Sequence, residues 1–227
     1  MTIADNIRRV REMISSAAVK SGRNPDDIIL IAAAKMKSAE SVREAVAGGV
    51  DAIGENRVQE MLEKNKRGAY ANTKLHYIGH LQSNKVRQIV GLCDMIQSVD
   101  SPDLLALIGK RAANLGIRQD VLIEVNIGRE PNKAGVLKEK LPEILEQAAN
   151  FPSVFIRGLM AVPPMIEKPG KYFDEMYNLF VDIRAKKYDN ISMNFLSMGM
   201  SDSFIEAIDA GANMVRVGSA IFGERQY

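Results

Sequence analysis

The sequence is poor in the side chains that build disulfides and metal sites. It has one cysteine, Cys93, and two histidines among 227 residues. A single thiol excludes an internal disulfide and suits a reducing compartment. With so few histidines and no tight cluster of carboxylates, a catalytic metal site is not expected. Because "GLCDMIQSVD" is typical of a helix end before a buried strand, we interpret Cys93 as a small packed thiol.

Long apolar runs and an excess of one charge are also missing. No run approaches the roughly 18 apolar residues that cross a bilayer, and the opening "MTIADNIRRVREMISSA" mixes acids with bases, unlike a signal peptide. Thirty basic against 28 acidic side chains leave a net charge of +2. No long basic run of the kind that binds nucleic acid is present. These absences predict a cytoplasmic protein without a membrane or nucleic-acid partner.

Short apolar segments alternate with helical patterns along the chain, after an amphipathic helix expected near 3–20. The expected strands cover 28–34, 52–54, 75–78, 95–99, 121–126, 155–159, 195–198 and 214–217. The expected helices lie near 39–48, 56–66, 82–91, 102–114, 138–149, 171–187 and 202–210. Strands that alternate with helices form parallel sheets with right-handed crossovers.

The fold class is therefore expected to be α/β, a single (β/α)8 TIM barrel with an extra N-terminal helix, since such units fit a chain of this length. A doubly wound open sheet is the structural alternative, because it shows the same alternation. No linker rich in proline, glycine or serine divides the chain. We therefore expect one domain over residues 1–227.

A lysine ends the first apolar segment, "IILIAAAKMKS". Lys35 comes directly after residues 28–34. It is either an ordinary lysine whose stem reaches solvent beside a buried strand, or an amine placed at the mouth of a barrel. Because active sites of such barrels collect at the carboxyl ends of the strands, its position suits a functional group.

Polar or glycine-containing segments follow most of the other expected strands. They are "IGENRVQE", "HYIGHLQSNK", "MAVPP", "LSMGMSDSF" and "RVGSAIFG". Each has a simple structural explanation as a cap, a turn or a strand end. In a barrel they would ring one mouth, so together they predict a site there.

Two of these segments favour a phosphate site. Gly199 can bring its backbone close to a ligand, and Ser201 stands at the start of the helix expected near 202–210, where unpaired amides attract anions. Gly218 and Ser219 would add two amides and a hydroxyl, and barrels often bind phosphate after strands seven and eight. A serine cap and a glycine turn would explain the same residues without a ligand.

The remaining polar residues narrow the chemistry. His76 precedes an apolar segment and is interpreted as structural, while His80 is either functional or a helix cap. No Ser–His–Asp arrangement, no Cys–His arrangement and no dinucleotide fingerprint is evident. A lysine near a phosphate cradle, without a metal, points to a phosphorylated aldehyde held as a Schiff base.

Several motifs together resemble the pyridoxal phosphate homeostasis protein family, which is similar to the N-terminal barrel of alanine racemase. They are "AAAK", "IGENRVQE", "LHYIGHLQSNK", "EVNIGREPNKAG", "RGLMAV", "LSMGMSDSF" and "RVGSAIFGER". The match runs nearly end to end and keeps the family's order. The resemblance implies that pyridoxal 5′-phosphate is the cofactor.

Carried over to this sequence, the resemblance implies that Lys35 forms the Schiff base and that Arg216 faces the pyridine nitrogen. The other implied contacts to the cofactor are Asn56, His80, Met198, Gly199, Met200, Ser201, Gly218 and Ser219. Lys133, in "NKAG", is either a secondary or transfer contact or an ordinary loop lysine.

Arg216 has a chemical consequence of its own. A guanidinium only donates hydrogen bonds, so the ring nitrogen that it meets must accept. An unprotonated ring is a weaker electron sink than a pyridinium. The site is therefore expected to resist chemistry such as transamination, whereas racemisation stays chemically feasible.

The sequence favours a carrier over an enzyme. Racemisation needs a proton donor or acceptor on each face of the substrate, and the resemblance to alanine racemase assigns the second one to a tyrosine of another domain. The chain ends at Tyr227 without room for that domain, and none of its tyrosines lies in a clear strand-end motif.

We therefore expect a monomeric, non-enzymatic carrier and regulator of pyridoxal phosphate. A small amino-acid racemase is the alternative. A third hypothesis is a binding partner of pyridoxal-phosphate-dependent apo-enzymes, to which Lys133 and the basic residues 64–67 would contribute, although a solvated helix face explains 64–67 equally well.

Overall fold

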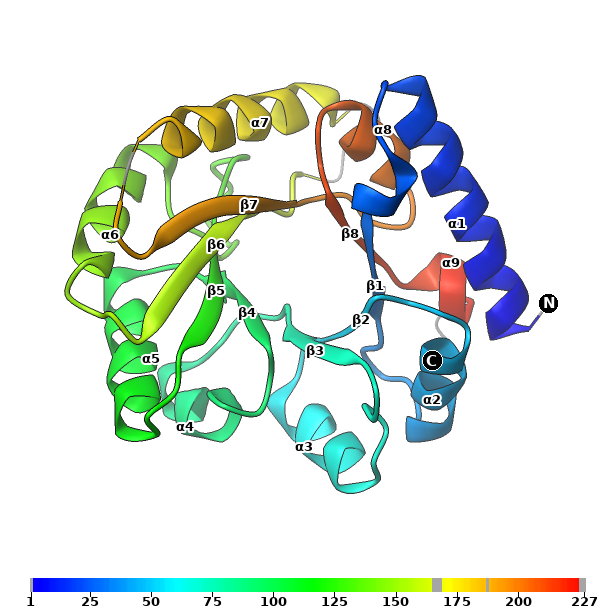
Figure 1. Ribbon diagram of the computed structural model, residues 1–227, viewed down its shortest axis with the longest axis horizontal. Coiled ribbons are helices and arrows are strands. Elements are labelled where there is room, and N and C mark those ends of the chain that lie inside the picture. The colour runs from blue at the N-terminus through cyan, green and yellow to red at the C-terminus, as the bar shows by residue number, and fades with distance from the viewer. Residues whose placement is uncertain (1, 165–168, 187, 225–227) are drawn as a thin grey trace.

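Eight parallel strands close into a barrel in the computed structural model, which describes residues 2–164, 169–186 and 188–224. The strands are β1 (Ile29–Ala33), β2 (Ala52–Glu55), β3 (Lys74–Tyr77), β4 (Met95–Val99), β5 (Gln119–Glu124), β6 (Val154–Met160), β7 (Ile191–Ser197) and β8 (Met214–Val217). They pair in chain order, and β8 pairs with β1. Figure 1 shows this ring of strands with the helices outside it. The (β/α)8 barrel is confirmed, and the open sheet is wrong.

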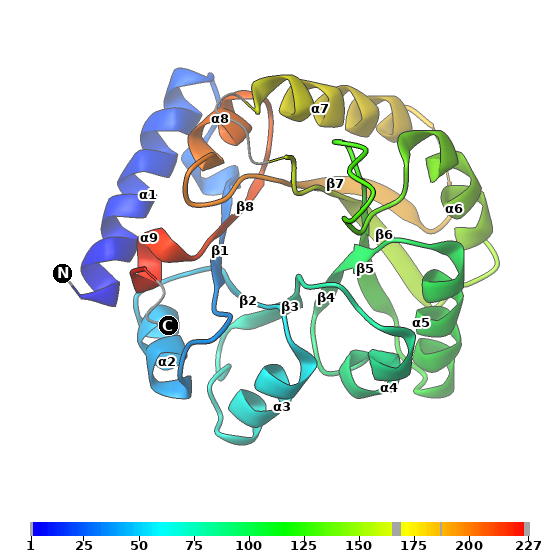
Figure 2. The same ribbon diagram turned by 180° about the vertical axis from the view of Figure 1, so that it is seen from behind.

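The helices cover the outside of the barrel. They are α1 (Ile3–Lys20), α2 (Ala39–Ala47), α3 (Val58–Lys66), α4 (Val86–Ile89), α5 (Pro102–Asn114), α6 (Leu141–Ala148), α7 (Gly170–Arg184), α8 (Phe204–Asp209) and α9 (Ser219–Phe222). The extra helix α1 begins with a capping box between Thr2 and Asp5. It lies beside α8 and α9 in both views (Figures 1 and 2).

Some boundaries differ from those expected. The helix expected at 82–91 is divided into a 3-10 turn, Ser83–Lys85, and the short α4. Helix α8 begins at Phe204, because the turn that precedes it takes up two more residues than the sequence pattern indicates. The pattern does not predict helix α9, and β7 starts earlier than expected because its first half alternates with polar residues. The expected end of α7 at Lys187 lies outside the described residues.

Two separate apolar cores result from the alternation of side chains along each strand. The inner core lies inside the barrel and consists of Ile31, Ala52, Met95, Leu122, Met160 and Met214. The outer core lies between strands and helices and takes neighbouring strand residues such as Leu30 and Val215. Since successive side chains point to opposite faces, this pattern also decides which polar residues face into the barrel.

Cys93 is buried in the outer core, in agreement with its interpretation from the sequence. Burial raises the pKa of its thiol to about 12, so the thiolate that would act as a nucleophile is suppressed at neutral pH. Among the described residues, no helix combines the length and the apolar character that crossing a membrane requires. No group of histidine, cysteine and carboxylate side chains suited to a metal ion occurs in that part of the chain either.

Two aspartates, each just before a strand, accept a hydrogen bond from the backbone near the start of the strand that precedes it in the sequence. Asp51, before β2, accepts the N–H of Leu30 at 2.6 Å, and Asp94, before β4, accepts the N–H of Leu75 at 2.8 Å. Because backbone donors at the edge of a barrel need acceptors, these carboxylates stabilise its amino-terminal rim.

Replacing Asp94 with alanine is expected to lower the free energy of unfolding by about 1–2 kcal/mol, because the N–H of Leu75 loses its acceptor. Asp94→Asn keeps an acceptor oxygen, as Asn213 does for the N–H of Leu196 at 2.8 Å, and should stay close to the parent protein. Urea unfolding of the two variants compares them directly. Equal losses would show that the charge of Asp94 matters, not its acceptor oxygen.

Candidate functional site at the carboxyl-terminal mouth

Lys35 lies in a tight turn directly after β1. The N–H of Lys37 donates to the carbonyl oxygen of Ala34 at 3.1 Å. Met36 has a positive φ of 60°, a conformation that costs any residue but glycine free energy. Its N–H donates to Oε2 of Glu60 at 2.7 Å. Hydrogen bonds on both sides of Lys35 thus fix its backbone at the carboxyl end of the barrel, where its side chain is exposed.

A buried ion pair supports this turn. Glu55, at the end of β2, is fully buried, and Nζ of Lys64 lies 2.7 Å from its Oε1. The hydroxyl of Tyr70 donates to the same oxygen at 2.9 Å. Lys64 also donates to the carbonyl oxygen of Ala34 at 2.8 Å. Burial raises the pKa of Glu55, and the ammonium of Lys64 opposes that shift. One ammonium therefore joins β2, α3 and the residue before Lys35.

The basic residues 64–67 do not share one environment. Lys66 and Arg67 are exposed, in keeping with a solvated helix face, whereas Lys64 is only 6% exposed. The interpretation of Lys64 as part of a solvated face is therefore wrong. Sequence reasoning missed it because its acceptors, Glu55 and Ala34, come from other elements of the barrel.

Arg216 points into the barrel from β8 and is 4% exposed. Its Nη1 donates to Oγ of Ser197 at 2.6 Å, and its Nη2 donates to the carbonyl oxygen of Ala161 at 2.9 Å. Burial lowers its pKa to about 10, and the nearby carboxyl of Glu124 opposes the shift. Arg216 therefore stays protonated at neutral pH and remains a donor only.

Glu124 ends β5 at the same mouth and is 9% exposed. Burial, together with the charge of Asp100, raises its pKa to about 7, while Arg216 opposes the shift. Oδ2 of Asp100 lies 3.2 Å from Nδ1 of His80, whose side chain is exposed. The mouth thus holds a carboxyl group that gains and loses a proton near neutrality.

Asn56 and His80 share a hollow of about 540 Å³ beside the loops that follow β2 and β3. The hydroxyl of Tyr77 lies within hydrogen-bonding distance of the backbone oxygens of both residues, at 3.2 and 3.1 Å, and shares its one proton between them. A Cβ at Gly79 would lie 2.2 Å from the oxygen of Asn56, so only glycine permits this approach. Oδ1 of Asn56 is buried without a hydrogen-bond partner among the described residues.

The loops after β7 and β8 meet, but not as the sequence pattern indicates. The hydroxyl of Ser201 accepts the N–H groups of Gly218 at 3.1 Å and of Ala220 at 3.3 Å. Ser201 therefore caps α9, and the expectation that it starts the preceding helix is wrong, since Ser203 is the residue before α8. Gly199 has a φ of +91°, and a Cβ there would lie 2.6 Å from that of Ala207.

Three other expected contacts fall at different depths. Met198 is fully buried in the outer core, because Ser197 faces inward and the next side chain must face outward. The expectation that Met198 lines the pocket is therefore not met. Met200 is 37% exposed, and Ser219 is exposed at the first position of α9, so both lie at the rim.

Lys133 lies in the loop after β5, which folds back so that the N–H of Val136 donates to the oxygen of Glu124 at 2.8 Å. Its Nζ lies 2.6 Å from Oε2 of Glu130 and 3.5 Å from the carbonyl oxygen of Pro163. The lysine is thus placed on the same side of the barrel as Lys35 and is held by an ion pair.

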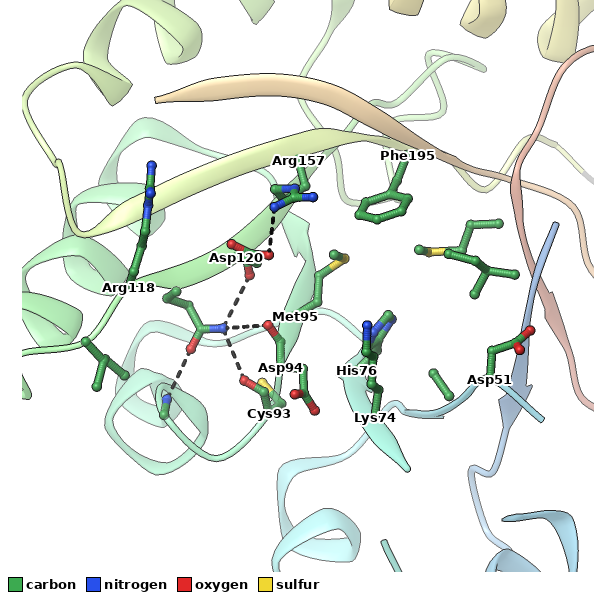
Figure 3. Close-up of a pocket in the computed structure, with 16 residues that line it drawn as sticks. Asp51, Lys74, His76, Cys93, Asp94, Met95, Arg118, Asp120, Arg157 and Phe195 are labelled. Carbon is green, nitrogen blue, oxygen red and sulfur yellow. Dashed lines mark hydrogen bonds and ion pairs between the residues drawn. The ribbon is translucent and has the colours of Figure 1, made fainter. Parts of the chain in front are cut away.

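A cavity of about 790 Å³ lies at the opposite end of the barrel, among residues that open the strands. Figure 3 shows His76, Asp120, Arg157 and Phe195 around it. Asp120 and Arg157 form an ion pair at 3.5 Å. His76 is 3% exposed, which agrees with its interpretation as a structural residue.

Sequence reasoning missed three polar residues of the barrel interior, Gln97, Ser197 and Glu124. Their strands contain other polar residues, such as Ser98 beside Gln97 in β4 and Asn194 before Ser197 in β7, so polarity alone does not show which side chain faces into the barrel. Alternation is the signal that could have found Ser197, because Arg216 and the residues of the inner core face the same way.

Comparison with known proteins first gives the broad class to which this fold and mouth belong. Residues 2–226 match the family described as alanine racemase, N-terminal domain. An alanine racemase of Clostridium difficile superposes with a TM-score of 0.76 at 17% identity, covering 98% of this chain and 57% of that one. That similarity shows the barrel fold.

Closer relatives narrow the class to one family. A protein of Aquifex aeolicus named pyridoxal phosphate homeostasis protein is 40% identical over 230 residues, covering 100% of each chain. The structure of PipY from Synechococcus elongatus with pyridoxal phosphate bound has a TM-score of 0.85 at 31% identity, covering 98% of this chain and 100% of PipY. This chain belongs to the pyridoxal phosphate homeostasis protein family.

Proposed function

We propose that this chain binds pyridoxal 5′-phosphate at the carboxyl-terminal mouth of its barrel. The observation that carries the proposal is the buried guanidinium of Arg216, a donor only, in the same mouth as the fixed turn of Lys35. Bound pyridoxal phosphate supplies an aldehyde that a lysine amine captures reversibly, a ring nitrogen that accepts a hydrogen bond, and a phosphate.

Features of the mouth fit these groups. Oδ1 of Asn56 is buried without a partner among the described residues, and the ring hydroxyl of pyridoxal phosphate is a donor that would satisfy it. Gly199 leaves no room for a Cβ, because that atom would meet Ala207 and Phe204 of α8, so the turn after β7 requires glycine at this position. Backbone amides and hydroxyls in two loops that touch each other are a suitable anion site.

The residues take the following roles in this proposal. Lys35 attaches the aldehyde, for which its amine must be neutral at the moment of attack. Arg216 donates to the ring nitrogen and Asn56 lies beside the ring. The phosphate is held by the loops at Gly199, Met200, Ser201, Gly218 and Ser219. His80 stands at the rim, and Lys133 is a secondary contact on the same side.

Lys35→Ala tests the attachment. The protein is mixed with pyridoxal phosphate, dialysed and reduced with borohydride, and its peptides are weighed by mass spectrometry. One cofactor mass on the peptide of residue 35 is expected, together with a long-wavelength absorbance band that dialysis does not remove. Both are expected to be lost in Lys35→Ala and kept in Lys133→Ala. A cofactor mass on Lys133 in both proteins would move the attachment there.

We further propose that the chain is a non-enzymatic, monomeric carrier that regulates the intracellular pools of pyridoxal phosphate and amino acids. Its relatives are named for homeostasis. Tyr77, at the end of β3, hydrogen-bonds to backbone oxygens, and Tyr70 hydrogen-bonds to Glu55, so neither serves as a second base as it stands. Delivery to a pyridoxal-phosphate-dependent apo-enzyme in the presence of an aldehyde scavenger would separate directed transfer from free release.

One observation favours a racemase as the alternative. Glu124 has a pKa of about 7 in the mouth, which suits a group that passes protons at neutral pH. The alternative predicts that the α-proton of an added amino acid exchanges with deuterium in D2O, seen by NMR, and that Glu124→Gln stops the exchange. Absence of exchange in the cofactor-loaded protein would rule out the racemase alternative.

A further inference from the structure

A chain of hydrogen bonds crosses the barrel interior from Arg216 to His76. Nη1 of Arg216 donates to Oγ of Ser197 at 2.6 Å, and Oγ of Ser197 donates to Oε1 of Gln97 at 2.7 Å. Nε2 of Gln97 lies 2.9 Å from Nδ1 of His76. The chain thus links β8, β7, β4 and β3, and it runs from the candidate site to the cavity of Figure 3, which His76 lines.

The hydrogen bonds of this chain are all donated in the same direction, from Arg216 toward His76. Arg216 can only donate, so the hydroxyl of Ser197 accepts from it and turns its own proton to Gln97. The amide oxygen of Gln97 is then the acceptor, so its NH2 group faces His76. Nδ1 of His76 must therefore accept, and the proton of the neutral ring is on Nε2. A guanidinium on one side of the barrel sets the tautomer of a histidine on the other.

Every member of the chain is withdrawn from water. Gln97 and Ser197 are 0% exposed, and His76 and Arg216 are 3% and 4% exposed. A buried polar group that loses its partner keeps its full desolvation cost, so reversing one link would leave several groups unsatisfied. Burial lowers the pKa of His76 to about 4, with Asp94 opposing and Lys74 adding to the shift. The ring is therefore neutral at pH 7, as the acceptor role of Nδ1 requires.

We propose that Ser197 and Gln97 are positioning residues that fix the guanidinium of Arg216 for an acceptor at the mouth, with His76 as the far end of their support. Fixing the guanidinium before a ligand arrives lowers the ordering cost of binding. The bonds to Ser197 and Ala161 use one terminal nitrogen each, which leaves further N–H donors for the acceptor. That the acceptor is the ring nitrogen of pyridoxal phosphate rests on the proposed function.

The tautomer of His76 is a direct readout, because the chain has only two histidines and the other, His80, is exposed. Protein labelled with ¹⁵N-histidine is studied by long-range ¹H–¹⁵N NMR without cofactor. The neutral Nε2–H form of His76 is expected at pH 7. In Ser197→Ala, Gln97 loses the donor that orients it, so a mixture of tautomers is expected.

Ser98→Ala is the matched control, since Ser98 is a buried serine on β4 whose hydroxyl lacks a partner among the described residues. It should leave the signals of His76 unchanged. The Nδ1–H form in the parent protein, or unchanged signals in Ser197→Ala, would overturn the proposal.

Binding of pyridoxal phosphate to the same proteins tests the positioning itself. Ser197→Ala is expected to weaken binding about tenfold, which corresponds to the loss of one charge-assisted hydrogen bond, and Ser98→Ala should bind as the parent does. Equal affinity of all three proteins contradicts a positioning role even if the tautomer shifts. If none binds the cofactor, the proposed function fails. The NMR signals of His76 still test the orientation of the hydrogen bonds from Arg216 to His76.

Discussion

Glu124→Gln is expected to raise the free energy of unfolding by about 3 kcal/mol at pH 8 and to leave it nearly unchanged at pH 4. The folded protein raises the pKa of Glu124 from 4.5 to about 7, and each tenfold gain in proton affinity corresponds to about 1.4 kcal/mol. The folded state binds this proton more tightly than the unfolded state does. The carboxyl group therefore favours folding below pH 4.5, and its contribution is lost as the pH rises toward 7.

Glutamine is uncharged at every pH, as the protonated carboxyl is, so Glu124→Gln removes this loss of stability at high pH. Urea unfolding of both proteins, without cofactor, at a series of pH values from pH 4 to pH 8 would show the gain developing between the two pKa values. Glu143→Gln, on the exposed side of α6, should give no such trend. A gain that is the same at all pH values would mean that packing, and not ionisation, distinguishes the two side chains.

Lys64→Met is expected to lower the free energy of unfolding by about 3 kcal/mol, because it leaves the fully buried carboxyl of Glu55 without its cation. Protonation of Glu55 limits the loss at low pH, so the effect should be greater at pH 8 than at pH 5. The carbonyl oxygen of Ala34 also loses a donor. The proposed capture of pyridoxal phosphate at Lys35 is therefore expected to weaken together with stability.

The double variant Lys64→Met with Glu55→Gln isolates the ion pair. It removes the carboxylate that Lys64→Met leaves without a cation, so it should recover much of the lost stability. A double-mutant cycle should then give a clear coupling free energy. Lys66→Met, on the exposed face of α3, should change stability little. If the double variant is no more stable than Lys64→Met alone, the lysine acts through packing and its bond to Ala34.

The barrel and the position of Lys35 could be predicted from local patterns, because a buried parallel strand is a continuous apolar run and Lys35 is the first residue after one. The roles of Lys64 and Glu124 could not, since each depends on partners distant in the chain. Lys64 is part of an ordinary basic helix until Glu55 and Ala34 are placed beside it. The pKa of Glu124 is raised by burial and by the charge of Asp100, against the opposing charge of Arg216, and none of these can be read from the residues beside it in the sequence.

Two further differences come from local geometry. The sequence pattern places Met198 in the pocket lining, but the inward orientation of Ser197 turns it outward. The pattern also makes Ser201 the cap of the helix that follows it, but the turn after Gly199 carries it across to Gly218. Both errors concern the direction of a side chain within a correctly located segment.

The methionine-rich inner core bears on how this family can evolve. Met95, Met160 and Met214 are flexible, unbranched side chains that fill irregular space, and interiors of this kind accept exchanges of similar volume at small cost. The glycines of the mouth have no such freedom, because a Cβ there would clash with its neighbours. The buried charges have none either, because losing a partner leaves them unpaired. Exchanges are therefore expected to be tolerated more readily in the filling of the barrel than at the mouth, so the proposed ligand site depends little on which apolar residues fill the core.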